Sequence, residues 1–429
     1  MTSIDYAQPE DDNARMAPNA VAASGDELAN LRPLPRISVH AFGETASLLD
    51  LMDHCANDRR LMNVNMRTNQ GSILAAASMF TTTPTPNLLI IEAAGGRDQL
   101  MNDLQKLAEV CDRDTHVVVI GDNNDIALYR ELIKNGISEY IVKPVSLADL
   151  IDVMSSIFVD PDSEPVGKTV AFFGAKGGVG ASTLAHNCSW GVSSLFSSGV
   201  ILADLDLAYG TANLNFDRDP LQGVAEAVFS QNQIDEVFMD RLLEKCSEHM
   251  SLLAAPSMMD RTFDLDEDAF MPMLDILQRS APMTVFDVPH VWNAWTKKLL
   301  ASVDRVVVVA SPDLANLRNA KNIFDVLSEL RPNDPVPHLI LNQVGMPKRP
   351  EISVSDFCSP FDVDPLAVVP FDAALFGTAS NSGRMIAEMD AKCPTAETIS
   401  QIAHVLTGRT QIKKQKGSAL SGILSKFGR

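Results

Sequence analysis

The chain has 429 residues, of which 46% are hydrophobic and 21% are charged, and its formal net charge is -20 at pH 7. The composition is close to that of globular proteins and predicts that most of the chain folds. The length predicts two domains. The acidic balance argues against a general nucleic-acid binder, because neutralising phosphates requires an excess of Lys and Arg. No apolar stretch reaches about 18 residues and the first residues lack the order of a signal peptide, so we expect neither export nor a membrane span.

The first part of the chain is predicted to be an arm followed by one α/β domain. Residues 1–35 are rich in Pro, Asn, Asp and Ala without hydrophobic periodicity, which is typical of a disordered arm. Across residues 36–158, short apolar runs alternate with amphipathic segments, at 37–42, 88–91, 117–120 and 140–142. Near-continuous apolar strands separated in this way predict a parallel sheet covered on both faces.

A second α/β domain is predicted after a linker. Residues 159–167 are polar and contain two prolines. Strand-like runs then recur through residues 168–410, at 169–173, 200–203, 284–286, 305–309 and 339–341. The fold class expected for the chain is therefore two doubly wound α/β domains. The six cysteines show no CxxC spacing, so neither a zinc site nor a disulfide framework is expected, and we interpret them as buried small hydrophobes.

A glycine-dense turn separates the apolar run that ends at Phe173 from a helix-prone segment. Its residues are Gly174, Ala175, Lys176, Gly177, Gly178, Val179, Gly180, Ala181, Ser182 and Thr183. Strand, glycine-rich turn and helix in this order predict a phosphate-binding loop, because glycines let backbone N–H groups surround an anion. The strict G-x-x-x-x-G-K-[ST] pattern is not met, since Ala175 replaces the first glycine and Ala181 replaces the lysine.

The residues that remain resemble the deviant loop K-G-G-x-G-K-[ST] of the ParA/MinD ATPases, with Lys176 as its extra front lysine. This resemblance implies ATP and Mg²⁺ as cofactors, and a homodimer in which Lys176 reaches the nucleotide of the partner. It assigns Lys176 a catalytic role and Ser182 a bond to the metal. It also implies that residues Lys176, Gly177, Gly178, Val179, Gly180, Ala181, Ser182 and Thr183 bind the nucleotide.

Four later motifs match the same family in order. Asp204-Leu205-Asp206 resembles its D-x-D, in which the first aspartate assists the metal and the second, catalytic one positions the attacking water. The run 284–289 resembles a Walker B strand, whose Asp287 would hold the magnesium. The resemblance further assigns the nucleotide base to Asn342, Pro370, Phe371 and Asp372. His290 follows the Walker B strand, and we interpret it as a surface or interface residue rather than a ligand.

The lysine that Ala181 replaces normally neutralises charge on the β- and γ-phosphates. Its loss predicts weaker nucleotide affinity and slow or absent hydrolysis, with Lys176 as the compensating cation.

A narrower resemblance links the runs 174–187, 204–212, 252–256 and 370–377 to the CpaE/TadZ proteins of tight-adherence (Flp, type IVc) pilus assembly. That branch joins an atypical receiver (flavodoxin-like) domain to the ATPase. The expected receiver residues are mostly missing: Glu92 stands at the phosphorylation position, and only Lys143-Pro144 fits. We therefore expect a protein-binding platform without phosphorylation. Lys143 and Glu92 form either an ion pair or a solvated pair worth under about 1 kcal/mol.

Residues 411–429 are basic, with apolar residues spaced for one helical face. Contact with the inner membrane, docking to a partner and disorder all remain open for this tail. The predicted function is an ATP-binding localisation and assembly factor for the pilus. We expect it to be cytoplasmic, at the inner face of the membrane or at a cell pole. The expected partners are proteins of the pilus or secretion machinery, and no nucleic acid is expected. The alternative is a partitioning or division-site ATPase, and a third possibility is a metabolic enzyme of the nitrogenase-iron-protein kind.

Overall fold

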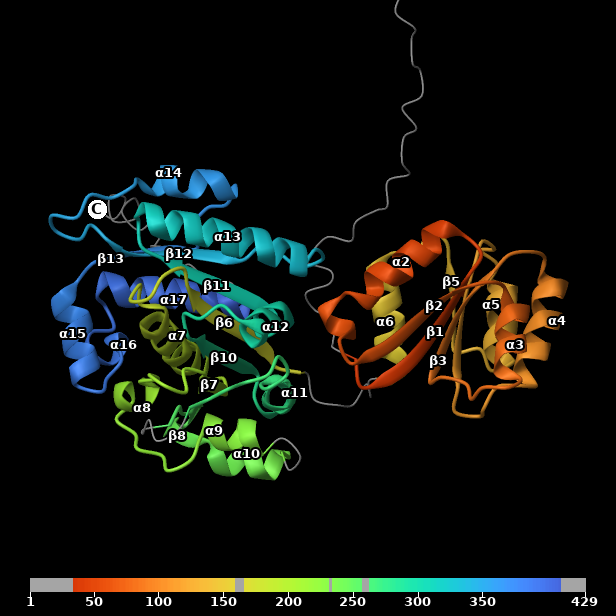
Figure 1. The fold of residues 1–429 in the computed structure, drawn as a ribbon, viewed down its shortest axis with the longest axis horizontal. Helices are drawn as coiled ribbons and strands as arrows, with labels where there is room; N and C mark the ends of the chain where they lie inside the picture. The colour runs from red at the N-terminus through yellow and green to blue at the C-terminus, as the bar shows by residue number, and fades with distance from the viewer. Residues whose placement is uncertain (1–33, 159–165, 231–233, 257–261, 410–429) are drawn as a thin grey trace, which may run out of the picture. The chain divides into compact units, whose positions relative to one another are not determined.

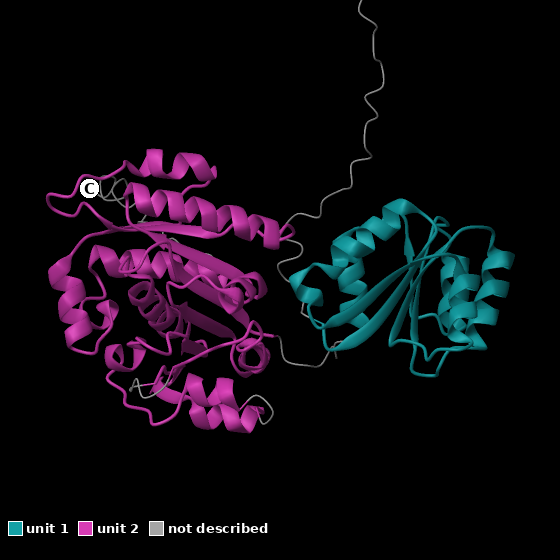
Figure 2. Cartoon of the chain, in the orientation of Figure 1, with its two compact units in different colours: residues 1–160 teal, residues 161–429 magenta. Residues whose placement is uncertain are grey.

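The computed structural model describes residues 34–158, 166–230, 234–256 and 262–409. The chain divides into two compact units, residues 1–160 and 161–429 (Figure 2). Nearly all of the predicted arm, most of the linker and the basic tail lie outside the described residues. No helix in the described part is long and apolar enough to cross a membrane.

Unit 1 is a parallel five-stranded sheet between two layers of helices (Figure 1). The strand order is β2-β1-β3-β4-β5, which is the flavodoxin-like order. The strands are β1 Ile37–Gly43, β2 Val64–Gln70, β3 Leu88–Ala93, β4 His116–Gly121 and β5 Glu139–Val142. Helices α2 Ala46–Ala56 and α6 Leu147–Phe158 cover one face, and α3 Ile73–Phe80, α4 Arg97–Ala108 and α5 Ile126–Lys134 cover the other.

Two details of unit 1 depart from the sequence analysis. Strand β2 was not expected, because the polar run VNMRTNQ lies at the sheet edge and has no fully buried residue. Leu34, assigned above to the arm, is buried in the core of the unit, and its N–H donates to the Arg60 carbonyl. The short helix Arg59–Leu61 supplies that carbonyl.

Unit 2 contains an eight-stranded sheet of order β13-β12-β11-β6-β10-β7-β9-β8. Strand β8 pairs antiparallel with β9, and the other strand pairs are parallel. The strands are β6 Lys168–Gly174, β7 Val200–Asp204, β8 Glu244–Ser247, β9 Met250–Leu253, β10 Met283–Val288, β11 Arg305–Ala310, β12 His338–Val344 and β13 Ala367–Pro370.

Helices cover both faces of this sheet (Figure 1). Helices α7 Ala181–Phe196 and α17 Pro394–Thr407 pack on one face, and α11 Met271–Ser280, α12 Ala294–Ser302 and α13 Leu314–Leu330 pack on the other. Shorter helices complete the unit: α8 Ala212–Asn215, α9 Val224–Phe229, α10 Glu236–Leu242, α14 Val354–Cys358, Ser359–Phe361, α15 Ala373–Asn381 and α16 Ile386–Met389.

The position of β6 near the middle of the sheet determines where the site lies. Its residues are almost entirely buried, because β10 and β11 flank it and helices cover both faces. Strands β6, β10 and β7 run parallel to one another, so their carboxyl-terminal ends lie on the same side of the sheet. The turn after Gly174 therefore lies beside the ends of β10 and β7. Asp287 and Asp204 are register partners at that edge.

The cysteines are only partly as expected. Cys55, Cys188 and Cys358 are buried, whereas Cys111, Cys246 and Cys393 are half-buried.

Candidate nucleotide-binding site

The turn after β6 forms an open cradle of backbone N–H groups. Gly178 and Gly180 have φ values of +79° and +86°, which glycine adopts without strain. A Cβ on Gly180 would lie 2.5 Å from the Asn342 amide nitrogen. Helix α7 begins at Ala181, and within the described part no side chain caps its first turn. Uncapped N–H groups at the start of a 16-residue helix favour an anion, so the residues present fit a nucleotide phosphate.

Neighbouring strands and helices hold this loop in place. The Asn342 amide donates to the Val179 carbonyl at 2.8 Å, and the Gln343 amide donates to the Gly178 carbonyl at 2.9 Å. The Asn319 amide donates to the Ala175 carbonyl at 2.9 Å. The structure thus places Asn342 against the loop, and its contact with adenine stays a prediction.

Lys176 projects from the loop as an exposed side chain. It attracts the carboxylate of Asp313, the residue that caps α13. Burial alone would raise the pKa of Asp313, but hydrogen bonds from Asn316 and the attraction of Lys176 lower it. The lysine therefore lies at the mouth of the loop, within the field of a carboxylate of its own chain.

A buried cluster of a histidine and two aspartates lies one helical turn beyond the start of α7. It consists of His186, Asp204 and Asp287, whose potential ligand atoms all lie within 4.8 Å of one another. His186 is fully buried, and its Nε2 lies 3.1 Å from Oδ2 of Asp287. The structure thus brings together the two aspartates that the sequence predicted as metal residues, and adds a histidine that it did not predict.

The two carboxylates of this cluster, Asp204 and Asp287, lie on the adjacent strands β7 and β10, and both are buried. Burial and the nearby Asp287 carboxylate raise the pKa of Asp204 to about 7. The attraction of His186 opposes that rise in the pKa of Asp204, and so do the hydrogen bonds that its oxygens accept from the Ala212 and Asp206 N–H groups. Two buried carboxylates at this distance favour a bound cation, because their repulsion has no other full compensation. The two carboxylates are oxygen ligands that fit Mg²⁺, whereas Nε2 of His186 faces Asp287.

The remaining predicted site residues lie around this edge of the sheet. Ser182 is exposed and Thr183 half-buried on the first turn of α7. Asp206 is half-buried, and its Oδ1 accepts from the Tyr209 N–H at 3.0 Å. Asp372 caps α15 by accepting from the Leu375 N–H, directly after the end of β13.

His290 lies beside the loop. It is exposed, its Nδ1 donates to the Gly174 carbonyl at 2.8 Å, and its ring packs against Phe173. It belongs to no group of potential metal ligands among the described residues.

A second polar site lies in unit 1, at the carboxyl end of β3. Glu92 is 1% exposed and accepts four hydrogen bonds: from the N–H groups of Glu44 and Thr45, the Thr45 hydroxyl, and Lys143 Nζ at 2.6 Å. Burial alone would raise the pKa of Glu92, but these donors lower it to about 2. Of the two interpretations left open above, the structure shows the ion pair, with the carboxylate buried.

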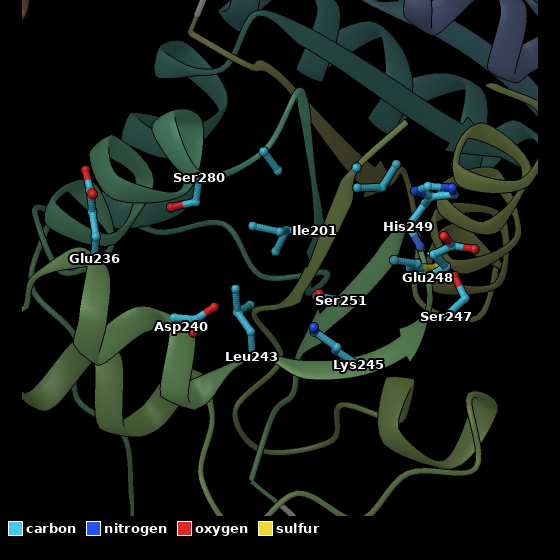
Figure 3. Close-up of a pocket in the computed structure, with 14 residues that line it drawn as sticks. Ile201, Glu236, Asp240, Leu243, Lys245, Ser247, Glu248, His249, Ser251 and Ser280 are labelled. Atoms are coloured by element: carbon cyan, nitrogen blue, oxygen red, sulfur yellow. Dashed lines mark hydrogen bonds between the residues drawn. The ribbon is translucent and has the colours of Figure 1, made fainter. Parts of the chain in front are cut away.

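A pocket in unit 2 lies away from the phosphate loop. It encloses about 360 Å³ and is lined by the first residues of β7 and β9 and the turn before β10 (Figure 3). Because these strands are parallel to β6, this is the sheet edge opposite the phosphate loop. The carboxylates of Glu236, Asp240 and Glu248 line it and outnumber the one lysine there, Lys245, so the charge of the lining disfavours a phosphate ligand.

Known proteins resemble this chain in both sequence and fold. No family model matches it. A solved pilus assembly protein CpaE from Caulobacter crescentus is 37% identical, over 30% of this chain and 98% of that one, with a TM-score of 0.30. The chain belongs to the CpaE family. Its membership rests on the sequence identity and on the coverage of that relative.

The ParA/MinD superfamily contains this family. The septum site-determining protein MinD of Bacillus subtilis is 24% identical, over 61% of this chain and 99% of its own length. A solved ParA family ATPase from Chlorobium tepidum is 19% identical, over 55% of this chain and 98% of that one, with a TM-score of 0.51. At that identity the likeness shows the fold, a mixed α/β P-loop ATPase fold with a parallel sheet.

Proposed function

We propose that this CpaE-family chain binds ATP and Mg²⁺ at the phosphate loop and forms a homodimer around the nucleotide. The uncapped start of α7 carries this proposal, because it presents free backbone donors beside a lysine and two buried carboxylates. Residues 176–183 would hold the phosphates, with Asn342, Pro370, Phe371 and Asp372 near the base. Ser182, Asp204 and Asp287 would hold Mg²⁺, which supplies charge neutralisation on the phosphates. Asp206 is the candidate for positioning the attacking water.

The dimer depends on Lys176, whose side chain is exposed at the mouth of the loop. Ala181 leaves the loop without the usual cation on the β- and γ-phosphates. A lysine from a second copy supplies that charge, and this makes nucleotide binding and dimerisation interdependent. Hydrolysis is slow or absent, and the chain acts as a scaffold.

The scaffold serves the assembly of a Flp/Tad pilus, through the pilus or secretion machinery at the membrane or a cell pole. The family membership supports this role, since the CpaE relative carries the name of a pilus assembly protein. The strand order of unit 1 is the flavodoxin-like order of a receiver. The carboxylate of its Glu92 accepts hydrogen bonds from four donors. We infer that it is a receiver-like, phosphorylation-independent platform for partners.

Sedimentation of the full chain with ATP, ADP or no nucleotide, in the presence of Mg²⁺, tests the dimer. We expect ATP to convert wild type to a dimer, and Lys176→Ala to remain monomeric at the same ATP concentration. Lys321→Ala is the matched control, since this exposed lysine of α13 pairs with Asp325 on its own helix. A sedimentation coefficient that ATP and Lys176→Ala both leave unchanged would refute the dimer.

A further inference from the structure

His186 makes a hydrogen bond with each ring nitrogen, although it lies in the interior of unit 2. Nε2 faces Asp287, and Nδ1 lies 3.0 Å from the Asn215 amide nitrogen. The ring also packs against Phe216, the residue after α8. A buried imidazole requires partners for both nitrogens, and here the partners belong to two different elements, β10 and α8.

The hydrogen-bond network assigns a direction to these bonds. The Asp287 carboxylate can only accept, so Nε2 of His186 carries the proton that this bond shares. The Asn215 amide nitrogen faces Nδ1 of His186, which accepts from it, and Oδ1 of Asn215 accepts from the Ser380 hydroxyl at 3.1 Å. One continuous chain of hydrogen bonds therefore joins α15, α8, α7 and β10.

Helix α8 is tied to the same cluster at a second point. The Ala212 N–H, at its first residue, donates to Oδ2 of Asp204 at 3.0 Å. Each of the two buried carboxylates thus holds one end of this four-residue helix, Asp204 directly and Asp287 through His186 and Asn215. A change in how either carboxylate is bound must alter a bond that fixes α8.

We propose that His186 is a positioning residue of the nucleotide site, which aligns the Asp287 carboxylate and links it through Asn215 to the position of α8. This inference rests on the proposed function, because the event that α8 reports is the binding of Mg²⁺ and nucleotide. The consequence is that α8, whose Leu214 is 65% exposed, changes its exposure or dynamics with the state of the metal site.

The test measures two properties of the full chain. The first is the Mg²⁺ concentration needed for half-maximal binding of a fluorescent ATP analogue. The second is the amide hydrogen exchange of residues 212–216 with and without Mg²⁺ and ATP. Wild type is expected to show a nucleotide-dependent change in that exchange.

Three variants separate the two bonds of His186. His186→Ala is expected to raise the Mg²⁺ requirement by about 10- to 100-fold, the usual effect of losing a residue that orients a metal ligand, and to weaken the exchange response to the part that Asp204 transmits through Ala212. His186→Gln keeps an amide donor at the reach of Nε2, so it restores the Mg²⁺ requirement but not the full response. Asn215→Ala leaves the Mg²⁺ requirement within about twofold of wild type and weakens the response in the same way as His186→Ala.

His249→Gln is the matched control, since this half-buried histidine lies at the opposite sheet edge (Figure 3). It is expected to match wild type in both measurements. Thermal unfolding of each variant confirms that it folds, and the half-buried Asn215 offers a test if His186→Ala does not. An unchanged Mg²⁺ requirement in His186→Ala, or an α8 response in Asn215→Ala equal to that of wild type, overturns the inference. Failure of wild type to bind nucleotide would instead overturn the proposed function, and this inference with it.

Discussion

Replacing Glu92 by glutamine tests how strongly a buried carboxylate stabilises unit 1. The pKa of Glu92 is lowered from 4.5 to about 2, chiefly by Lys143 and Thr45 acting against burial. At about 1.4 kcal/mol per pH unit, this corresponds to roughly 3 kcal/mol of folding free energy at neutral pH. Because the folded-state pKa lies below the unfolded value, the contribution is present above pH 4.5 and is lost as the pH falls toward 2. Glu92→Gln removes the charge that four donors share.

Amide hydrogen exchange of residues 88–93 and 117–120 in the full chain measures this loss as a lower free energy of opening. We expect a decrease of about 2–3 kcal/mol at pH 7 in Glu92→Gln. Glu131→Gln is the control, because the Arg97–Glu131 pair is exposed and contributes about 0–1 kcal/mol. A decrease below about 1 kcal/mol in Glu92→Gln would show that the pair behaves as a solvated one.

Three further predictions concern unit 2. Gly210→Ala places a Cβ 2.5 Å from Oδ2 of Asp204, so thermal unfolding should show a loss of about 1–3 kcal/mol in the free energy of unfolding. The control Gly377→Ala, with open space around it, should show no loss. Equal losses in the two variants would contradict the clash. Because the pKa of Asp204 is raised to about 7, its carboxyl must lose a proton to bind metal. The affinity for Mg²⁺ should therefore fall by up to about tenfold per pH unit below pH 7. A Mg²⁺ affinity that stays constant from pH 8 to 6 would exclude this proton linkage. Ala181→Lys should raise the rate of phosphate release from ATP by about 100-fold, and an unchanged rate would mean that the missing lysine does not limit turnover.

The sequence predicts the central strands of both sheets, because strands buried on both faces are continuous apolar runs. It does not predict the edge strands β2, β8 and β13, since edge strands keep exposed residues on their open side and resemble loops, and it also misses the short strand β9 beside β8. The phosphate loop is predicted because it is contiguous in the chain. Its geometry adds the contacts from Asn342 and Gln343, which come from a strand more than 160 residues away.

His186 and Thr45 were missed for a different reason. Both bind carboxylates that are distant in sequence, and no motif assigns either of them a role. One signal was present for His186: it is a polar residue four positions after Ser182, on a helix that must face the sheet. Only the register of β10 with β7 shows that two aspartates meet it there.

The two units differ in how the charge of their buried carboxylates is compensated, and this difference predicts where Mg²⁺ binds. Glu92 is satisfied by Lys143 and three neutral donors, so it needs no metal. Asp204 faces Asp287, and the one group of three potential metal ligands in the described part of the chain lies there. Adding Mg²⁺ and ATP should therefore slow hydrogen exchange within residues 166–230 and 283–288 and leave residues 88–93 unchanged. Protection of residues 88–93 equal to that of residues 283–288 would mean that the Glu92 site also binds the cation, against the charge balance derived from its donors.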